Sequence, residues 1–426
     1  MSSDRLKVLD KINWDFDKAK TNYGIHSFHW YLSTYVPQIP NILISSLSKS
    51  KEDLILDPFS GRGTTLVEAM RLNRPSIGID LNPMAIFISK VKTTMINPID
   101  LEKEISNLLR NIIEEAENLS WSPFFSNGVN INIDLEKHIP NFPNKHQWFH
   151  KNTLIELSLI KKEINRIENK DIREFCLLAF SDRLKYCSVH SNRNYGYIAD
   201  NCLNPSKNGT KKYELKYKNA IKEFKDKLND MLADFKVFIN ELREKNISIK
   251  EANSLTRCIP ANSQNLSFIE DESIDQIITS PPYPLATDYL MGFRLSFYWL
   301  KDELSEYFPK NFSSNDEYLD LINKMKAEEI CPRYKRHLKK NAIESYFQSM
   351  DITCSEMNRI LKPNGYFSLV IGGSNHSIGN KTIPEEIINI SGKNNFILQK
   401  NISRKITNHR FPARRIVDEN ILIFKK

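Results

Sequence analysis

The chain has 426 residues, a formal net charge of +8 and 26% charged residues. This length predicts two or three domains, or one catalytic domain with a long insertion. No stretch approaches the roughly 20 apolar residues of a membrane helix, and residues 1–18 lack the apolar core of a secretory signal, so we expect no membrane association. The modest positive net charge is compatible with a polyanionic partner, but many proteins carry such a charge, so it does not identify the partner.

The cysteine pattern bears on compartment and on metal binding. No two cysteines form a C-x-x-C pair, and none has Cys or His partners at zinc-finger spacing. We therefore expect no metal site and free, reduced thiols in a cytoplasmic protein. The six cysteines are Cys176, Cys187, Cys202, Cys258, Cys331 and Cys354.

Short apolar runs predict the strands of a sheet. A helical pattern at 64–73 separates the first two runs, and another helical pattern precedes the run at 365–373. Strands separated by helices indicate β-α-β units and a mainly parallel sheet in an α/β fold. The predicted strands lie at 53–58, 76–80, 246–252, 273–280, 365–373 and 419–426.

Two long inserts interrupt the alternation of predicted strands and helices. The first, 97–245, falls between the second and third predicted strands and reads mainly as helix, with a loop at 188–213 rich in Asn, Gly, Lys and Tyr. The second, 285–345, ends in the basic run CPRYKRHLKK. An ordinary amphipathic or solvated helical hairpin is the plainer interpretation of the last stretch of the first insert. Its helical patterns cover 153–168, 172–186 and 213–245.

The first predicted strand runs into the segment DPFSGRGTT, residues 57–65, which opens a helix. Its glycines allow the backbone to approach a ligand closely, and ligands bind outside the carboxyl ends of strands in open α/β sheets. Asp80 ends the second strand, where a carboxylate can accept hydrogen bonds from both hydroxyls of a ribose. The G-x-G pattern has no third glycine and no following Gly-Lys-Ser/Thr, so a phosphate cradle is not expected. Alone, the pattern also fits a plain turn.

These residues resemble a known family. DPFSGRGTTLVEA and GIDLNPMA look like the first two motifs of DNA amino-methyltransferases, and HSFHWYLSTYVPQIP (26–40) is similar to the family segment that folds over the methionine part of the cofactor. The resemblance covers about 21–95 and 246–300, with a weaker match at the C-terminal end. It implies a Rossmann-like methyltransferase fold that binds S-adenosylmethionine over the first strand.

The resemblance also implies roles for single residues. Asp57 and Gly61 would lie near the amino-acid moiety of the cofactor, and Asp80 would hold its ribose. Asn253 stands where the family usually has an acidic residue that contacts the adenine. The full set implied for the cofactor is Phe28, Thr34, Asp57, Phe59, Gly61, Gly63, Thr64, Asp80 and Asn253.

The segment Thr279-Ser280-Pro281-Pro282-Tyr283 follows the strand IDQII. The two prolines remove backbone donors and stiffen the chain, which leaves carbonyls free as acceptors. Ser280 Oγ and the Pro281 carbonyl can each accept one N–H of a base amino group, and Tyr283 can stack on a base flipped from the helix. In isolation S-P-P-Y is more often a strand-ending turn; after DPFSGRGTT we interpret it as catalytic.

The TSPPY form resembles the fourth motif of methyltransferases that modify cytosine N4, and of some that modify adenine N6. Many adenine enzymes have Asp in place of Ser280, which favours cytosine. The motif order differs from that of cytosine enzymes that place S-P-P-Y first, so order does not assign the base. Asp288 and Arg294 are expected to serve the site or the DNA, with helix capping or a surface role as an equal alternative.

The resemblance divides the chain into a catalytic domain (1–96 and 246–426), a helical insertion (97–245) that is a candidate target-recognition region, and the second insert at 285–345. The implied partner is double-stranded DNA, with a cognate restriction endonuclease as a further partner. Alternatives are RNA methylation, a non-catalytic DNA-binding regulator and a fused nuclease, although neither an RRM or KH motif nor a PD-(D/E)xK constellation is visible. The basic residues expected at DNA are Arg193, Lys207, Lys211, Lys212, Arg294 and Arg333.

Overall fold

The computed structural model of the chain describes most of the sequence, with gaps. Everything below concerns these residues: 2–17, 19–20, 22–32, 34–120, 133–189, 215–282, 292–309, 339–373, 382–406 and 418–426.

The described residues form a seven-stranded mixed sheet with strand order β3-β2-β1-β4-β5-β7-β6. The first five strands in this order are parallel, and β7 runs antiparallel to both of its neighbours. This confirms the predicted α/β fold with a mainly parallel sheet. The strands are β1 (Ile55–Asp57), β2 (Ser76–Asp80), β3 (Thr256–Pro260), β4 (Ile274–Thr279), β5 (Leu361–Gly373), β6 (Ile397–Lys405) and β7 (Asp418–Lys425).

The strand order reverses between β1 and β4. Successive strands run outward from β1 through β2 to β3, and then the chain returns to the other side of β1 to form β4. At such a switch point the connections leave in opposite directions, so a crevice opens outside the carboxyl ends of the two strands. The fold therefore places the residues that follow Asp57 and Thr279 at one edge of the sheet.

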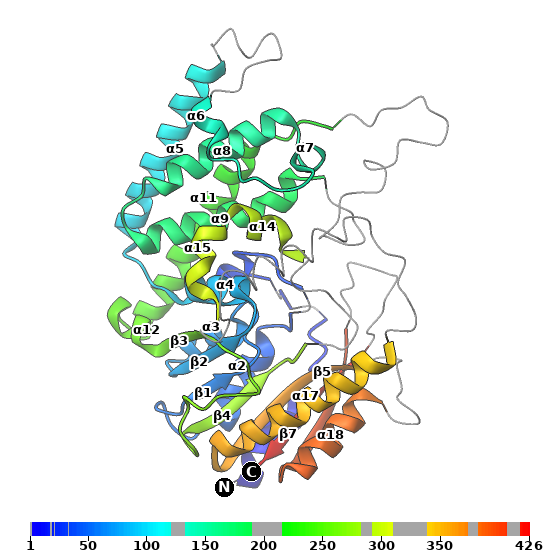
Figure 1. The fold of residues 1–426 in the computed structure, drawn as a ribbon. Coiled ribbons are helices and arrows are strands. Elements are labelled where there is room, and N and C mark those ends of the chain that lie inside the picture. Colours follow the sequence, from blue (N-terminus) through cyan, green and yellow to red (C-terminus); the bar gives the residue numbers. More distant parts are fainter. Residues whose placement is uncertain are drawn as a thin grey trace.

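Helices cover both faces of the sheet (Figure 1). On one face α17 (Lys339–Ile360) and α18 (Ile383–Lys393) pack on the apolar side chains of β1, β2, β4, β5 and β7. On the other face α2 (Gln38–Leu47) and α3 (Thr64–Arg71) share a core with the N-terminal α1 (Ser2–Val8) and η1 (Leu9–Lys11). The next helix, α4 (Pro83–Thr93), packs on β2 and β3.

The described residues of the first insert, 97–120, 133–189 and 215–245, are mainly helical, as predicted. The helix α11 shows the reason: Phe224, Leu228, Met231 and Phe235 recur on one face and are buried. These side chains belong to one core that includes Phe87 of α4, so the insertion packs directly on the part of the chain that forms the sheet and its helices (Figure 1). Its helices are α5 (Pro98–Ser120), α6 (Ile133–Glu136), α7 (Lys145–Trp148), α8 (Lys151–Asn165), α9 (Lys170–Cys187) and α11 (Ala220–Glu244).

Two strand predictions need correction. The run at 246–252 is not a strand, because Ser248 caps α12 (Ile249–Leu255) by accepting a hydrogen bond from the amide of Glu251. The third strand, β3, starts only at Thr256. The edge strand β6 was not predicted, since its residues do not alternate between apolar and polar.

The described part of the second insert is also helical. It forms α14 (Arg294–Trp299), α15 (Lys301–Leu304) and η3 (Ser305–Tyr307), which pack against α9 and α4. Among the described residues, no helix combines the length and apolarity that crossing a membrane requires. The four cysteines in the described ranges carry free thiols.

Candidate active site

Asp57 lies at the carboxyl end of β1 and is fully buried. Its Oδ1 accepts hydrogen bonds from Thr279 Oγ1 at 2.6 Å and from the amide of Phe59 at 3.2 Å. Its Oδ2 accepts a hydrogen bond from Thr65 Oγ1, and the hydroxyl of Tyr35 bonds to Thr65 in turn. Because Thr65 gives its proton to the carboxylate, Tyr35 is the donor to Thr65. One carboxylate thus joins β1, β4 and α3.

Burial raises the pKa of Asp57 from 3.8 to about 6, although the hydrogen bonds from Thr279 and Thr65 oppose the shift. Burial also raises the pKa of Tyr35, so its phenol stays protonated. At neutral pH Asp57 is therefore an ionised carboxylate that is satisfied by hydroxyl donors.

The loop after β1 is held from three sides. The amide of Ser60 donates to the carbonyl of Ile79 at 2.8 Å, which docks the loop on β2. From α4, Ser89 Oγ donates to the carbonyl of Gly61 at 2.9 Å, and Lys92 Nζ donates to the carbonyl of Arg62 at 2.7 Å. Lys92 is buried, and burial lowers its pKa well below the usual value. The loop conformation is therefore rigidly specified.

The two glycines are required here for different reasons. Gly63 has φ +74°, and a Cβ on it would lie 2.9 Å from Ser89 Oγ and 3.1 Å from Ser89 Cα. Gly61 has φ +49°, and a Cβ there would lie 3.3 Å from the ring of Tyr31. Both backbones adopt the left-handed region that glycine tolerates, and an added Cβ would meet Ser89 closely at Gly63 and the Tyr31 ring tightly at Gly61.

Asp80 ends β2 beside this loop. Its Oδ2 accepts a hydrogen bond from the backbone amide of Gly61 at 2.9 Å, and its Oδ1 accepts one from the backbone amide of Asn82 at 2.9 Å. Burial raises the pKa of Asp80 from 3.8 to about 6. The backbone of Leu81 is a further donor to this carboxylate, whose two oxygens together offer about four acceptor positions, so acceptor capacity remains for a ligand hydroxyl.

Two further observations fit a nucleoside ligand at this loop. The buried hydroxyl Ser60 Oγ has no hydrogen-bond partner among the described residues. Leu81, directly after Asp80, is a large apolar side chain that is 46% exposed, which gives a base a surface to pack on. The residues present therefore fit S-adenosylmethionine, whose ribose would bind Asp80.

Three of the expected residues lie in packed surroundings. Phe28 is fully buried, and its ring packs edge-on against Phe175 of α9 at 5.5 Å, so it belongs to the core of the insertion. Asn253 lies in α12 before β3, where its side chain bonds both the amide and the carbonyl of Met95, at 2.6 and 2.9 Å. Arg294 is 3% exposed at the first residue of α14.

The remaining cofactor candidates lie close to the loop in sequence and in space. Thr64 is buried as the first residue of α3, and Phe59 is partly buried against the core under β1. Thr34 is half-buried one residue before Tyr35. Sequence reasoning missed Tyr31, Tyr35, Thr65, Ser89 and Leu81. Tyr31 and Tyr35 lie in the segment 26–40, Thr65 lies in DPFSGRGTT and Leu81 directly follows Asp80, so the motifs contained these residues without singling them out, whereas Ser89 carried no signal.

The catalytic segment follows β4. Ser280 is half-buried, Pro281 is buried and Pro282 is exposed. Through Thr279 the segment is tied to Asp57, so the motif of the cofactor loop and the motif of the catalytic segment meet at the switch point. Other predicted residues lie outside the described ranges, namely Tyr283 and Asp288 and the basic residues Arg193, Lys207, Lys211, Lys212 and Arg333.

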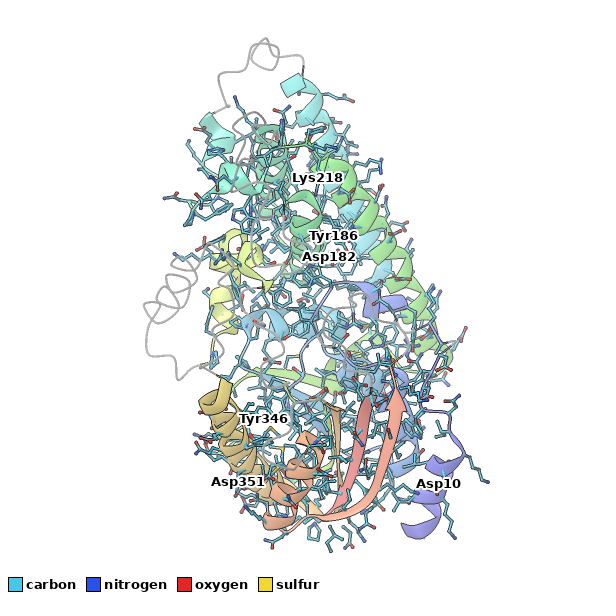
Figure 2. All side chains as sticks on the ribbon, turned by 90° about the vertical axis from the view of Figure 1, so that its right-hand side faces the viewer. Asp10, Asp182, Tyr186, Lys218, Tyr346 and Asp351 are labelled. Carbon is cyan, nitrogen blue, oxygen red and sulfur yellow. The ribbon has the colours of Figure 1, made fainter. Side chains whose placement is uncertain are left out.

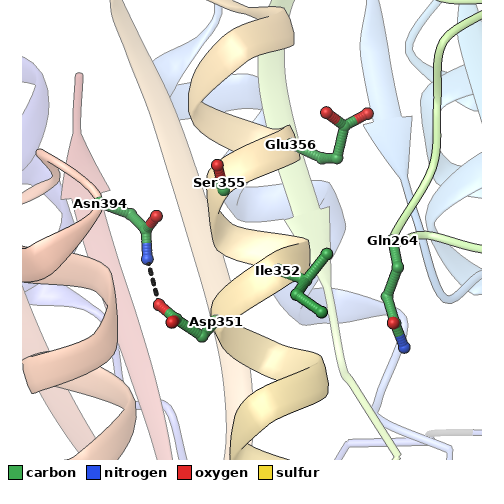
Figure 3. Close-up of a pocket in the computed structure, with 6 residues that line it drawn as sticks. All are labelled: Gln264, Asp351, Ile352, Ser355, Glu356 and Asn394. Carbon is green, nitrogen blue, oxygen red and sulfur yellow. Dashed lines mark hydrogen bonds between the residues drawn. The ribbon is translucent and has the colours of Figure 1, made fainter.

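One open hollow lies on α17 (Figure 3). It measures about 340 Å³ and is lined by Gln264, Asp351, Ile352, Ser355, Glu356 and Asn394. The two carboxylates that line the hollow already have hydrogen-bond partners. Asp351 accepts a hydrogen bond from Asn394 Nδ2 at 2.7 Å, and Glu356 accepts one from the backbone amide of Leu266 at 2.9 Å. We assign it a structural role, because none of the candidate site residues lines it.

Comparisons with known proteins agree with this geometry. Residues 14–91 match the N6/N4 methyltransferase family model, which is described as DNA methylase. The Type II methyltransferase M.MvaI of Kocuria varians is 27% identical over 96% of this chain and 91% of its own length. The Type II methyltransferase M.BsoBI of Geobacillus stearothermophilus is 27% identical over 66% of this chain and 54% of its own length.

Solved structures are more distant. TrmN from Thermus thermophilus is 10% identical over 93% of this chain and 50% of its own, with a TM-score of 0.32. The functional assignment therefore depends on the family model, on the similarity to Type II methyltransferases and on the site at the switch point. Together they show that the chain is similar to DNA amino-methyltransferases, over residues 14–91 in the family model and over most of its length in M.MvaI, and this similarity supports S-adenosylmethionine as the methyl donor.

Proposed function

We propose that this chain methylates the exocyclic amine of a flipped base in double-stranded DNA, and that the base is cytosine, modified at N4. The observation that carries the proposal is the hydrogen bond between Thr279 and Asp57. It holds the loop implied for the cofactor and the start of S-P-P-Y at the same edge of the sheet. A methyl donor at the first and an amine at the second would meet there.

In this proposal the chain's residues act on the amine. S-adenosylmethionine supplies an electrophilic methyl group when bound. Ser280 Oγ and the Pro281 carbonyl each accept one N–H of the amine, which orients its lone pair toward the methyl group. Tyr283 stacks on the flipped base. Aligned acceptors of this kind contribute most in the transition state, because the amine gains positive charge as the new bond forms.

The cofactor residues have separate tasks. Asp80 accepts the ribose hydroxyls, the loop from Phe59 to Thr64 approaches the amino-acid part, and Leu81 packs on the adenine. Asp57 acts by position, since its oxygens are already engaged by Thr65, Thr279 and a backbone amide. This role differs from the ligand contact that family resemblance implies.

The insertion at 97–245 is proposed to recognise the DNA, together with the second insert. The basic residues expected there are Arg193, Lys207, Lys211, Lys212 and Arg333. Each phosphate contact that is removed lowers the slope of log affinity against log salt by about one. Charge reversal at these positions that leaves both DNA affinity and slope unchanged would place recognition elsewhere.

The product test uses mass spectrometry of digested plasmid DNA after incubation with the protein and labelled S-adenosylmethionine. N4-methylcytosine confirms the proposal. N6-methyladenine alone overturns the cytosine assignment and retains the amino-methyltransferase reaction. DNA binding without label in DNA would indicate a regulator. We further propose that the protein acts in the cytoplasm, as the modification half of a restriction–modification system or as an orphan enzyme.

A further inference from the structure

The segment of residues 26–32, which we term the junction segment, contacts three parts of the molecule that the proposed reaction must coordinate. These are the helical insertion, the cofactor loop and the end of the chain that carries S-P-P-Y. Figure 2 shows Asp182 at the end of the insertion that faces the sheet. The junction segment packs against this end.

The insertion holds the junction segment through charged groups. Asp182 of α9 accepts the amide of Trp30 on Oδ1 at 2.9 Å. From α11, Lys227 Nζ donates to the carbonyl of Ser27 at 2.8 Å, and Ser27 Oγ donates to Asp234 at 2.9 Å. Because the backbone itself is bonded, a shift of α9 relative to α11 must move the segment or break these bonds.

Asp182 is ionised and central to this set. It is 2% exposed. Its Oδ2 accepts Arg183 Nε at 2.9 Å and lies 3.7 Å from Lys227 Nζ. These positive charges hold the pKa of its carboxyl below the usual value, although burial opposes them. A hydrogen bond from a backbone amide to a buried carboxylate is about twice as strong as one to a neutral acceptor.

The same segment borders the cofactor loop. Arg62 Nη1 donates to the carbonyl of His26 at 3.1 Å. The ring of Tyr31 lies against Gly61, 3.3 Å from where a Cβ would be, and its hydroxyl accepts a hydrogen bond from Asn82 Nδ2 at 3.5 Å. Tyr31 thus contacts both sides of the Asp80 site.

The third contact is with the chain that leaves S-P-P-Y. The ring of Trp30 stacks on Phe293 with centroids 4.5 Å apart and planes at 12°. A Cβ on Gly292 would lie 2.7 Å from Leu32 Cδ1, so the two segments touch closely. The chain from Ser280 onward therefore returns to the junction segment within about a dozen residues.

Buried polar side chains connect the same parts. His29 Nδ1 donates to the carbonyl of Trp30 at 2.6 Å, so its Nε2 accepts from Ser181 Oγ at 3.0 Å. Ser181 in turn bonds to Ser296 of α14 at 2.8 Å. Burial lowers the pKa of His29 to about 4, which agrees with a neutral ring that donates at one nitrogen and accepts at the other.

We infer that Asp182 is a positioning residue that couples DNA binding by the insertion to the affinity for the cofactor, acting through Trp30 and Tyr31. The inference rests on the proposed function. Coupling between two ligands is reciprocal, and values of 5- to 150-fold are typical. A duplex that fixes α9 against α11 fixes the junction segment, and with it the position of Tyr31 over Gly61.

The test measures the dissociation constant of S-adenosylhomocysteine by calorimetry, with and without a duplex that the wild type methylates. In the wild type we expect the duplex to tighten binding by about fivefold or more. Asp182→Asn should reduce this ratio to less than about twofold. If Asp182 had a purely structural role, the substitution would raise the dissociation constants with and without duplex by the same factor. Their ratio would then stay at the wild-type value, and that result would overturn the inference.

The matched control is Glu163→Gln. Glu163 is a buried carboxylate on α8 of the same insertion, and it pairs with Arg166 of its own helix end at 2.6 Å rather than with the junction segment. It should keep the wild-type ratio. If Asp182→Asn does not fold, Ser27→Ala removes the bond to Asp234 and should lower the ratio by a smaller factor. A wild type that methylates DNA without any coupling refutes the inference alone, whereas a wild type that methylates no DNA refutes the proposed function.

Discussion

Thr279 Oγ1 donates a 2.6 Å hydrogen bond to Asp57 Oδ1 across 222 positions of sequence. The bond joins the last residue of β4 to the last residue of β1. It sets the distance between the cofactor loop and Ser280, so the precision of the whole site depends on it.

Thr279→Val should therefore destabilise the protein. The change keeps the shape of the side chain and removes one donor to a buried carboxylate, at a cost of about 1.5–3 kcal/mol. Urea unfolding at pH 7.5, where Asp57 is ionised, measures the loss. Thr353→Val is the control, because the buried Thr353 hydroxyl bonds to the neutral hydroxyl of Ser263, at 3.4 Å, and not to a carboxylate. Its loss should be about 0.5–1.5 kcal/mol. Equal losses would show that the Asp57 bond has no special strength.

Asp80→Asn should weaken the binding of S-adenosylhomocysteine. An amide oxygen cannot replace both carboxylate oxygens toward two ribose hydroxyls, and bonds to a charged acceptor contribute about 1.5–3 kcal/mol, or about 10- to 150-fold in affinity. Calorimetry measures the effect. Asp275→Asn, on the same sheet but bonded to Lys362 at 2.7 Å, should bind normally. An unchanged dissociation constant in folded Asp80→Asn would remove Asp80 from the site.

The affinity for the cofactor should fall as the pH drops through about 6. Burial raises the pKa of Asp80 to about 6, so the carboxylate that accepts the ribose hydroxyls becomes protonated below that pH. In the limit, affinity then falls about tenfold per pH unit. Titrations between pH 5 and 8 should show this bend in the wild type, and a flat profile in Asp80→Asn.

The free protein should show the opposite trend. The folded carboxyl groups of Asp57 and Asp80 have pKa values raised from 3.8 to about 6, so the folded state binds protons more tightly than the unfolded state. Their contribution to stability is complete below pH 3.8 and is lost as the pH rises through 6. The ionised site is thus less stable but competent to bind.

Gly63→Ala should reduce stability and cofactor affinity together. A non-glycine residue in the left-handed region costs about 1–2 kcal/mol, and the added Cβ also presses on Ser89. Gly392→Ala is the control, since Gly392 lies in α18 with no atom within 4 Å of an added Cβ, and alanine suits a helix better than glycine. Thermal unfolding should show a loss for the first and none for the second.

Ser280→Ala should lower kcat far more than it weakens cofactor binding, because it removes an acceptor aligned with the reacting amine. Loss of one such group typically costs about 100- to 1,000-fold in kcat. Single-turnover methylation, with S-adenosylhomocysteine calorimetry alongside, separates the two effects. If the cofactor dissociation constant rises as much as kcat falls, Ser280 is part of the cofactor site.

The sequence by itself determined the elements that depend on neighbouring residues. The strand at 76–80 and the helix that starts at Thr64 match the prediction, because apolar runs, glycine turns and cap residues act within a few positions. The motifs at Asp57, Asp80 and Ser280 were visible for the same reason. The strand at 246–252 failed where a local cap at Ser248 outweighed the apolar pattern.

Only the tertiary structure decided what these residues contact. Phe28 and Arg294 were expected at ligands, yet the packing of the insertion helices buries both. Asn253 stands near a family motif in sequence, but α12 turns it toward the backbone of Met95. The bond from Thr279 to Asp57 and the bond from Trp30 to Asp182 each span more than a hundred residues. Burial and the pairing of distant donors and acceptors depend on how the elements pack, which no local pattern in the chain records.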